Sequence, residues 1–126
     1  MFTNLFSQKA KKEVDWVFLN DISMLDEIDQ QSFSKPVLIF KHSTRCSISS
    51  MTLNRFENSV KDEAGFQLYF LDLISHRDIS NEVAMRYQVE HQSPQAILVR
   101  DGKAVYDASH TGIIYEEVER KVTGLL

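Results

Sequence analysis

Hydrophobic residues along this chain fall into two alternating patterns, short β-branched runs and stretches with apolar residues at helical spacing. Short apolar runs bounded by proline, glycine or aspartate are typical of buried strands, and apolar residues three or four positions apart are typical of amphipathic helices. The runs predict strands over residues 16–19, 36–40, 66–72, 96–99 and 104–106. The periodic stretches predict helices over residues 21 to about 32, 47 to about 61, 78–87 and 113 to about 122.

Local sequence signals support these boundaries. Proline at position 36 disfavours helix at Lys35 and resets the chain into a strand. Asp101-Gly102 is a strong tight-turn signal, which makes residues 104–106 the returning strand of a hairpin. Asp78 is expected to cap the third helix, and Asp72 is expected to face a loop. The apolar faces expected of the four helices are Ile22, Leu25 and Ile28; Ile48, Met51, Leu53 and Phe56; Ile79, Val83 and Tyr87; and Ile114, Val118 and Val122.

The predicted element order is β-α-β-α-β-α-β-β-α. Strand–helix–strand alternation implies parallel strands joined by right-handed crossovers, and the final hairpin adds antiparallel strands. We therefore expect an α/β fold with a mixed sheet of about five strands, flanked on both faces by about four helices. Residues 1–13 are expected to form a tail or short helix, whose Phe2, Leu5 and Phe6 cap apolar surface, and residues 14–126 a single domain.

The composition narrows the classes of protein to which this chain can belong. With 126 residues and 43% hydrophobic content, it can bury a substantial core. Its net charge of −4 offers no basic surplus for phosphates, so nucleic acid is not an expected partner. No apolar stretch approaches the roughly 18 residues of a membrane span, and the start lacks the basic region of a signal peptide. We expect a cytoplasmic protein with no membrane partner.

The single cysteine, Cys46, excludes an intramolecular disulfide and a cysteine-rich zinc site. It agrees with a reducing compartment, where free thiols persist. The histidines at positions 76, 91 and 110 are scattered without the spacing of metal ligands. No metal site is therefore expected.

Cys46 follows the strand over residues 36–40, at the point where a helix is expected to begin. In open sheets with parallel strands, ligands bind beyond the carboxyl ends of the strands. The unpaired N–H groups at a helix start favour an anion, and the adjacent Arg45 and upstream Lys41 make the surroundings electropositive. This setting favours a nucleophilic thiolate. Most free cysteines are inert buried hydrophobes, and the motif alone leaves the two interpretations evenly balanced.

Two segments carry a resemblance to a known family: Phe40-Lys41-His42-Ser43-Thr44-Arg45-Cys46-Ser47-Ile48-Ser49 and the later His91-Gln92-Ser93-Pro94. They resemble the YtxJ-type monothiol bacilliredoxins, thioredoxin-like proteins linked to the small thiol bacillithiol. Together with the element order, the resemblance covers nearly all of the chain beyond the N-terminal tail. Ser47 stands where the family often has proline. This change removes a residue that is pre-organised for the first helical position, and it bears on the reaction rate more than on the reaction type.

The resemblance implies roles for residues around Cys46. The Ser93–Pro94 peptide bond would be cis and packed beside Cys46, with the Ser93 backbone exposed to an extended substrate. Ser49 holds the position of the resolving cysteine of dithiol relatives, so Cys46 would act alone. The thiolate would be supported by Arg45, Ser47 and Ser49. Thiol or substrate binding would involve Lys41, His42, Thr44, Ser93, Pro94, Thr111 and Gly112.

Three of these assignments have plainer alternatives. Lys41 would contact a carboxylate of the small thiol, as a lysine there often does in monothiol glutaredoxins, but it is equally well explained as a solvated lysine. His42 would favour the thiolate or assist protonation, although the sequence offers it no evident partner. Thr111-Gly112 would open the last helix and line the rim of the thiol pocket. The glycine is equally well explained by a turn that needs positive φ.

The implied function is that of a monothiol thiol–disulfide oxidoreductase that reduces or transfers bacillithiol mixed disulfides on client proteins, in redox homeostasis and the stress response. It would hold no bound cofactor and would use bacillithiol as co-substrate, with glutathione or coenzyme A left open. Its partners would be S-thiolated proteins, and the chain would be a monomer or a weak dimer. A peptide-binding adaptor or redox sensor without turnover is the main alternative. A monothiol iron–sulfur cluster carrier is a further one.

Overall fold

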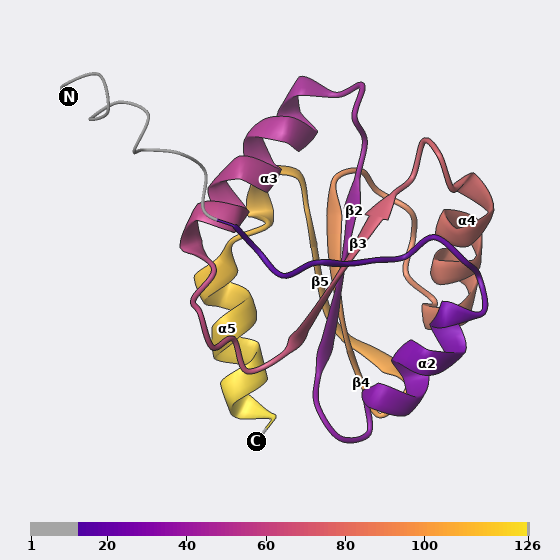
Figure 1. The fold of residues 1–126 in the computed structure, drawn as a ribbon, viewed down its shortest axis with the longest axis vertical. Coiled ribbons are helices and arrows are strands. Elements are labelled where there is room, and N and C mark those ends of the chain that lie inside the picture. Colours follow the sequence, from indigo (N-terminus) through magenta and orange to yellow (C-terminus); the bar gives the residue numbers. More distant parts are fainter. Residues whose placement is uncertain (1–12, 126) are drawn as a thin grey trace, which may run out of the picture.

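The structure, a computed structural model, describes residues 13–125. The element order predicted from the sequence is confirmed (Figure 1). The elements are β1 (Val17–Phe18), α2 (Met24–Gln31), β2 (Val37–His42), α3 (Ser47–Ser59), β3 (Gln67–Asp72), α4 (Arg77–Tyr87), β4 (Gln95–Arg100), β5 (Lys103–Ser109), the 3₁₀ helix η1 (His110–Gly112) and α5 (Tyr115–Gly124). The tail predicted over residues 1–13, including the capping role of Phe2, Leu5 and Phe6, lies outside the described residues except for Glu13.

The sheet has the strand order β1-β3-β2-β4-β5. Strands β1, β3 and β2 run parallel, β4 pairs antiparallel with β2, and β5 pairs antiparallel with β4. The predicted mixed α/β fold is therefore confirmed. Strand β2 lies at the centre of the sheet. Residues 43–46, which include Cys46, join its carboxyl end to α3, and Figure 1 shows this connection between the two elements.

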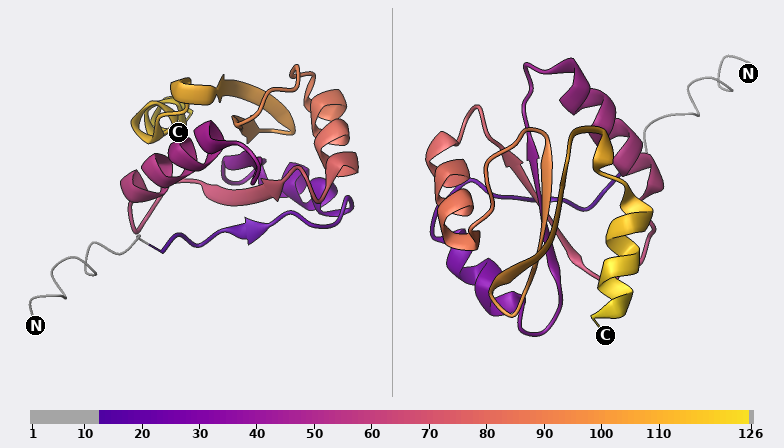
Figure 2. Two further views of the ribbon diagram at one scale, coloured as in Figure 1. Left: turned by 90° about the horizontal axis from the view of Figure 1, so that it is seen from above. Right: turned by 180° about the vertical axis from the view of Figure 1, so that it is seen from behind.

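Two apolar cores lie on opposite faces of the sheet. Helices α2 and α4 cover one face and α3 and α5 the other, as the front and back views show (Figures 1 and 2). Side chains of a strand alternate between its faces. In β2, Val37 and Ile39 belong to the core under α2 and α4, and Leu38 and Phe40 to the core under α3 and α5. This alternation continues beyond the apolar run, so that Lys41 faces α2 and α4 and His42 faces α3.

Several element boundaries differ from the prediction. The first strand is confined to β1, and α4 begins after His76 rather than after a cap at Asp78. The last helix begins at Tyr115, because η1 and an extended Ile113 intervene after β5. The predicted hairpin turn is confirmed, with φ of 56° at Asp101 and 74° at Gly102. Paired positive φ values are what a two-residue hairpin turn requires.

The apolar face predicted for α3 is wrong in part. Ile48 and Met51 are 45% and 65% exposed, and the buried positions of the helix include Ser49, Thr52 and Phe56. These two sets occupy neighbouring stripes of the helix, and the stripe that ends in Phe56 turns toward the sheet. Two apolar side chains are thereby left on the surface in the first two turns after Cys46.

The predicted faces of α2 and α5 lose one residue each. Ile22 is 44% exposed and Ile114 40% exposed, because both precede the first helical turn. The predicted face of α4, with Ile79, Val83 and Tyr87, is buried as expected. Within residues 13–125, no helix combines the length and the apolar character needed to cross a membrane.

Candidate active site

Cys46 is the N-cap residue of α3, just beyond the carboxyl end of β2. Its backbone is extended, with φ −115° and ψ 121°, and its carbonyl accepts a hydrogen bond from the Ser50 N–H at 3.1 Å. The Cys46 N–H donates to the Ser43 carbonyl at 3.2 Å, which closes the turn that leads into the helix. The cysteine is free and partly exposed. Partial exposure of this residue is a condition for its attack on a substrate sulfur.

Ser49 holds the turn before Cys46 in place. Its hydroxyl is buried, accepts the Ser43 N–H at 3.1 Å and lies 2.7 Å from Nδ1 of His42. Since the oxygen accepts from Ser43, its own proton can be donated to His42 when the ring nitrogen is unprotonated. Through these contacts, Ser49 links the first turn of α3 to the end of β2. Its support of the thiolate stays a prediction.

His42 packs on the α3 side of the sheet. Only 6% of the residue is exposed, and its ring centroid lies 5.6 Å from that of Phe70. No partner for His42 is evident from the sequence, whereas the structure places its ring against the buried hydroxyl of Ser49. A role of this ring in holding the thiolate or moving a proton stays a prediction.

The exposed residues next to Cys46 in sequence are polar or cationic, and those on the first turns of α3 include two apolar ones. Thr44, Arg45 and Ser47 are exposed neighbours of the cysteine in sequence. Ile48 and Met51 are exposed on the adjoining turns of α3. An exposed guanidinium acts through solvent, so Arg45 contributes a field that salt weakens.

Lys41 is fully buried on the other face of the sheet, so its interpretation as a solvated lysine is wrong. Its ammonium donates to Oε1 of Gln95 at 2.9 Å and lies 2.7 Å from Nδ1 of His91. Burial lowers the pKa of Lys41 to about 8. These contacts direct Nζ away from α3. Binding of a thiol carboxylate by Lys41 stays a prediction.

The loop before β4 lies at the same end of the sheet as Cys46. Gln95 pairs with Lys41 in antiparallel register, which places Ser93 and Pro94 beside the segment that follows β2. The Ser93–Pro94 peptide bond is cis. The Ser93 hydroxyl is buried and has no hydrogen-bond partner within residues 13–125. These positions suit the predicted substrate-binding role, which stays a prediction.

Thr111 and Gly112 belong to η1, which packs beside α3. Arg55 of α3 donates from Nη2 to the carbonyls of Thr111 at 3.0 Å and Ile113 at 2.7 Å. The alternative explanation of Gly112 by a positive φ is wrong, because in this turn it is His110 that has φ of 55°. A place for Thr111 and Gly112 at the rim of a thiol pocket stays a prediction.

Three contacts of this region were not anticipated from the sequence. His91 and Gln95 contact Lys41, and Arg55 ties η1 to α3. The position of Gln95 immediately after Pro94 was a usable signal, since the residue after the loop must pair with the end of β2. Nothing in the sequence marks Arg55 among other exposed arginines.

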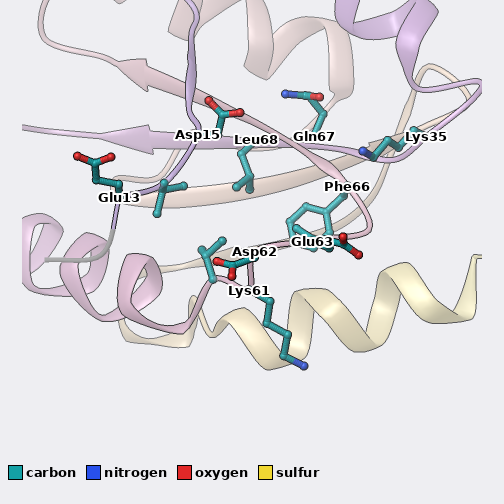
Figure 3. A pocket seen from close by; sticks show the side chains of 12 residues that line it. Glu13, Asp15, Lys35, Lys61, Asp62, Glu63, Phe66, Gln67 and Leu68 are labelled. Carbon is teal, nitrogen blue, oxygen red and sulfur yellow. The ribbon is translucent and has the colours of Figure 1, made fainter.

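A cavity of about 400 Å³ lies at the opposite end of the molecule (Figure 3). It is lined by residues 13–15, by the segment after α3 and by Gln67 and Leu68 at the start of β3. Cys46 follows the carboxyl end of β2, so this cavity is not part of the cysteine site. Within residues 13–125, no group of three or more histidine, cysteine or carboxylate side chains could hold a metal ion.

Comparison with known proteins agrees with this arrangement. Residues 18–118 match the family model of the monothiol bacilliredoxin BrxC. A solved structure named, provisionally, as an oxidoreductase with a thioredoxin fold is 28% identical, with a TM-score of 0.72 over 82% of this chain and 90% of that one. Thioredoxin NaTrxh from Nicotiana alata is 14% identical, with a TM-score of 0.70 over 91% and 96% of the two chains. The thioredoxin of Malassezia sympodialis, also 14% identical, has a TM-score of 0.68 over 90% and 92%.

Proposed function

Because the chain belongs to the monothiol bacilliredoxin family, with a thioredoxin-like oxidoreductase fold, we propose that it removes bacillithiol from S-thiolated client proteins. The Cys46 thiolate attacks the bacillithiol sulfur of a protein mixed disulfide. The old S–S bond breaks, the client sulfur leaves as a thiolate and takes a proton from solvent, and a Cys46–bacillithiol disulfide forms.

A second thiol completes the cycle. The thiolate of a free bacillithiol molecule attacks the bacillithiol sulfur of the Cys46 adduct, which releases Cys46 and forms bacillithiol disulfide. The second thiol must come from outside, because Ser49 stands where a resolving cysteine would lie and the chain has a single cysteine. The balanced sum is one mixed disulfide and one bacillithiol converted into one client thiol and one bacillithiol disulfide.

The observation that carries the proposal is the position of Cys46. A partly exposed thiol at the N-cap of α3 lies next to unpaired backbone N–H groups, in the part of the fold where ligands bind. Arg45 adds positive charge, and the Ser93–Pro94 loop offers an edge for an extended client segment. The protein would act in the cytoplasm, with no resident cofactor.

The test is the intact mass of the protein after incubation with bacillithiol disulfide, and separately with glutathione disulfide. A single adduct that forms with bacillithiol disulfide, is absent from Cys46→Ala and is lost on addition of free bacillithiol supports the proposal. Ser50→Ala is the matched control, since Ser50 is exposed and its side chain makes no hydrogen bond within residues 13–125. Equal adducts from both disulfides would refute the choice of bacillithiol. Failure of any adduct at neutral pH would refute the nucleophilic role of Cys46.

A peptide-binding adaptor without turnover is a second candidate. It is favoured by Ile48 and Met51, which expose apolar surface beside Cys46. An adaptor would bind an unmodified client peptide equally well in the native protein and in Cys46→Ala. The oxidoreductase would need Cys46 to retain a thiolated one.

A further inference from the structure

Lys41 is the buried centre of a polar cluster behind the Cys46 site, which also contains the buried Gln95 and the exposed His91. It is a lysine with no exposed surface, and its two hydrogen-bond partners, Gln95 and His91, carry no negative charge. Within residues 13–125, no carboxylate forms an ion pair with it. Burial of an ammonium group is costly unless the charge is paired and hydrogen-bonded. Its contacts therefore call for an explanation other than general packing.

The partners of Lys41, His91 and Gln95, lie on either side of Pro94 in sequence. Gln95 Oε1 accepts the Lys41 ammonium at 2.9 Å and also the Gln92 N–H at 3.3 Å, while its Nε2 donates to the Glu90 carbonyl at 3.0 Å. His91 lies in the same loop. The one ammonium thus links residues 90–95 to the carboxyl end of β2, just before the segment that contains Cys46.

We propose that Lys41, Gln95 and His91 are positioning residues that clamp the loop before Pro94 against β2, and that the clamp opens when His91 gains a proton. Only the ligand of this loop, a segment of a client protein, rests on the proposed function. The clamp itself follows from the contacts.

Hydrogen-bond donors and acceptors explain why the clamp depends on the state of His91. Lys41 can donate to Nδ1 only when that nitrogen carries a lone pair, which requires a neutral ring with its proton on Nε2. A protonated ring would set two donors and two positive charges 2.7 Å apart. The loop would then be repelled from Lys41, and Gln95 would remain the only hydrogen-bond acceptor of the ammonium.

The charged groups around the pair act in the same direction. Burial, then Lys41, then Arg77 at the start of α4 lower the pKa of His91 below its ordinary value of 6.5. Asp72, at the end of the adjacent strand β3, accepts the N–H groups of Ile74 and Ser75 in the β3–α4 loop and is not among the groups that shift the pKa of His91. The clamp is therefore closed at neutral pH and opens only in the acid range below pH 6.5.

Amide hydrogen exchange of the reduced full-length protein, followed by NMR between pH 5 and pH 8, tests the clamp without any substrate. The Gln92 N–H, which donates to Gln95, is the reporter, and its rate is corrected for intrinsic exchange. We expect its protection to fall about tenfold as His91 titrates, which corresponds to the loss of one hydrogen bond. His91→Asn, whose side-chain oxygen can still accept from Lys41, should retain the neutral-pH protection and lose the transition. His76→Asn, the matched control, should keep it.

Lys41→Met should lose the Gln92 protection at every pH, and Lys103→Gln, which removes an exposed lysine, should not. Equal protection of Gln92 at pH 5 and pH 7.5 in the native protein would overturn the proposal, as would the same transition in His91→Asn. The KM for a bacillithiolated client peptide should rise below pH 6.5 in the native protein and stay level in His91→Asn. If no turnover is found, the proposed function fails, and the exchange data still decide the clamp.

Discussion

Replacement of Lys41 by methionine should make the protein more stable at neutral pH and remove part of its pH dependence. Burial lowers the pKa of Lys41 from 10.5 to about 8, so the unfolded chain binds this proton more tightly than the folded one. The shift corresponds to a cost of about 3 kcal/mol at pH 7, where the lysine is charged in both states. Loss of the bonds to Gln95 and His91 offsets about 1 kcal/mol each. The free energy of unfolding of Lys41→Met should therefore exceed that of the native protein by about 1 kcal/mol.

The sign of the pH dependence separates this effect from packing. Stability rises with pH wherever the unfolded state binds more protons, so the native protein should gain stability as pH rises from 8 to 10.5. Relative to Lys41→Met, the gain between pH 7 and pH 10 should be about 2.5 kcal/mol. Groups that titrate in both proteins cancel in this difference.

The assay is urea unfolding of both proteins, followed by circular dichroism at several pH values from 7 to 10 with reductant present. Lys103→Gln is the matched control and should show the native pH dependence. A constant free-energy difference between native protein and Lys41→Met across this range would refute the reasoning. It would mean that Lys41 keeps an ordinary proton affinity despite its burial.

Three further predictions concern the surroundings of Cys46. Arg45→Ala should slow alkylation of Cys46 at pH 7 about threefold at low salt, and the effect should nearly vanish at about 1 M salt because an exposed charge is screened. A salt-independent effect would contradict this prediction, and Arg100→Ala is the control. Ser49→Cys should form a disulfide with Cys46 on mild oxidation, since positions three apart in the first helical turn lie within disulfide range; an oxidised protein with two free thiols would contradict it. Met51→Ser should weaken binding of a thiolated client peptide about threefold without changing the rate of the small-thiol adduct, whereas Met85→Ser, on exposed α4 surface, should change neither.

The order of elements could be predicted because each boundary is set by local residues. Proline at position 36, the Asp101-Gly102 turn and the loop before Pro94 interrupt the chain irrespective of what packs around them. The place of Cys46 followed from the same logic, since a strand that runs into a helix leaves the residue between them at a helix start.

The side-chain environment could not be predicted to the same degree. In α3, the stripes through Ile48 and through Ser49 are adjacent, and sequence spacing does not say which one the sheet covers. Phe56 and the packing of α5 decide it. Apolar residues on an exposed stripe near a reactive thiol are therefore read as core when only periodicity is considered.

Lys41 illustrates a second limit. The apolar run ends at Phe40, and a charged residue after such a run is ordinarily solvated. Here β2 continues to His42, and the loop after α4 covers Lys41 from a distance of 50 residues in sequence. Such burial depends on contacts between distant segments, which no local pattern encodes.

The most direct test of the central claim is the rate at which a client thiol is released from a bacillithiolated peptide in excess bacillithiol. The native protein should accelerate release catalytically and accumulate a transient Cys46–bacillithiol disulfide, while Cys46→Ala should match the uncatalysed rate. Equal rates with the native protein and with Cys46→Ala would contradict the account.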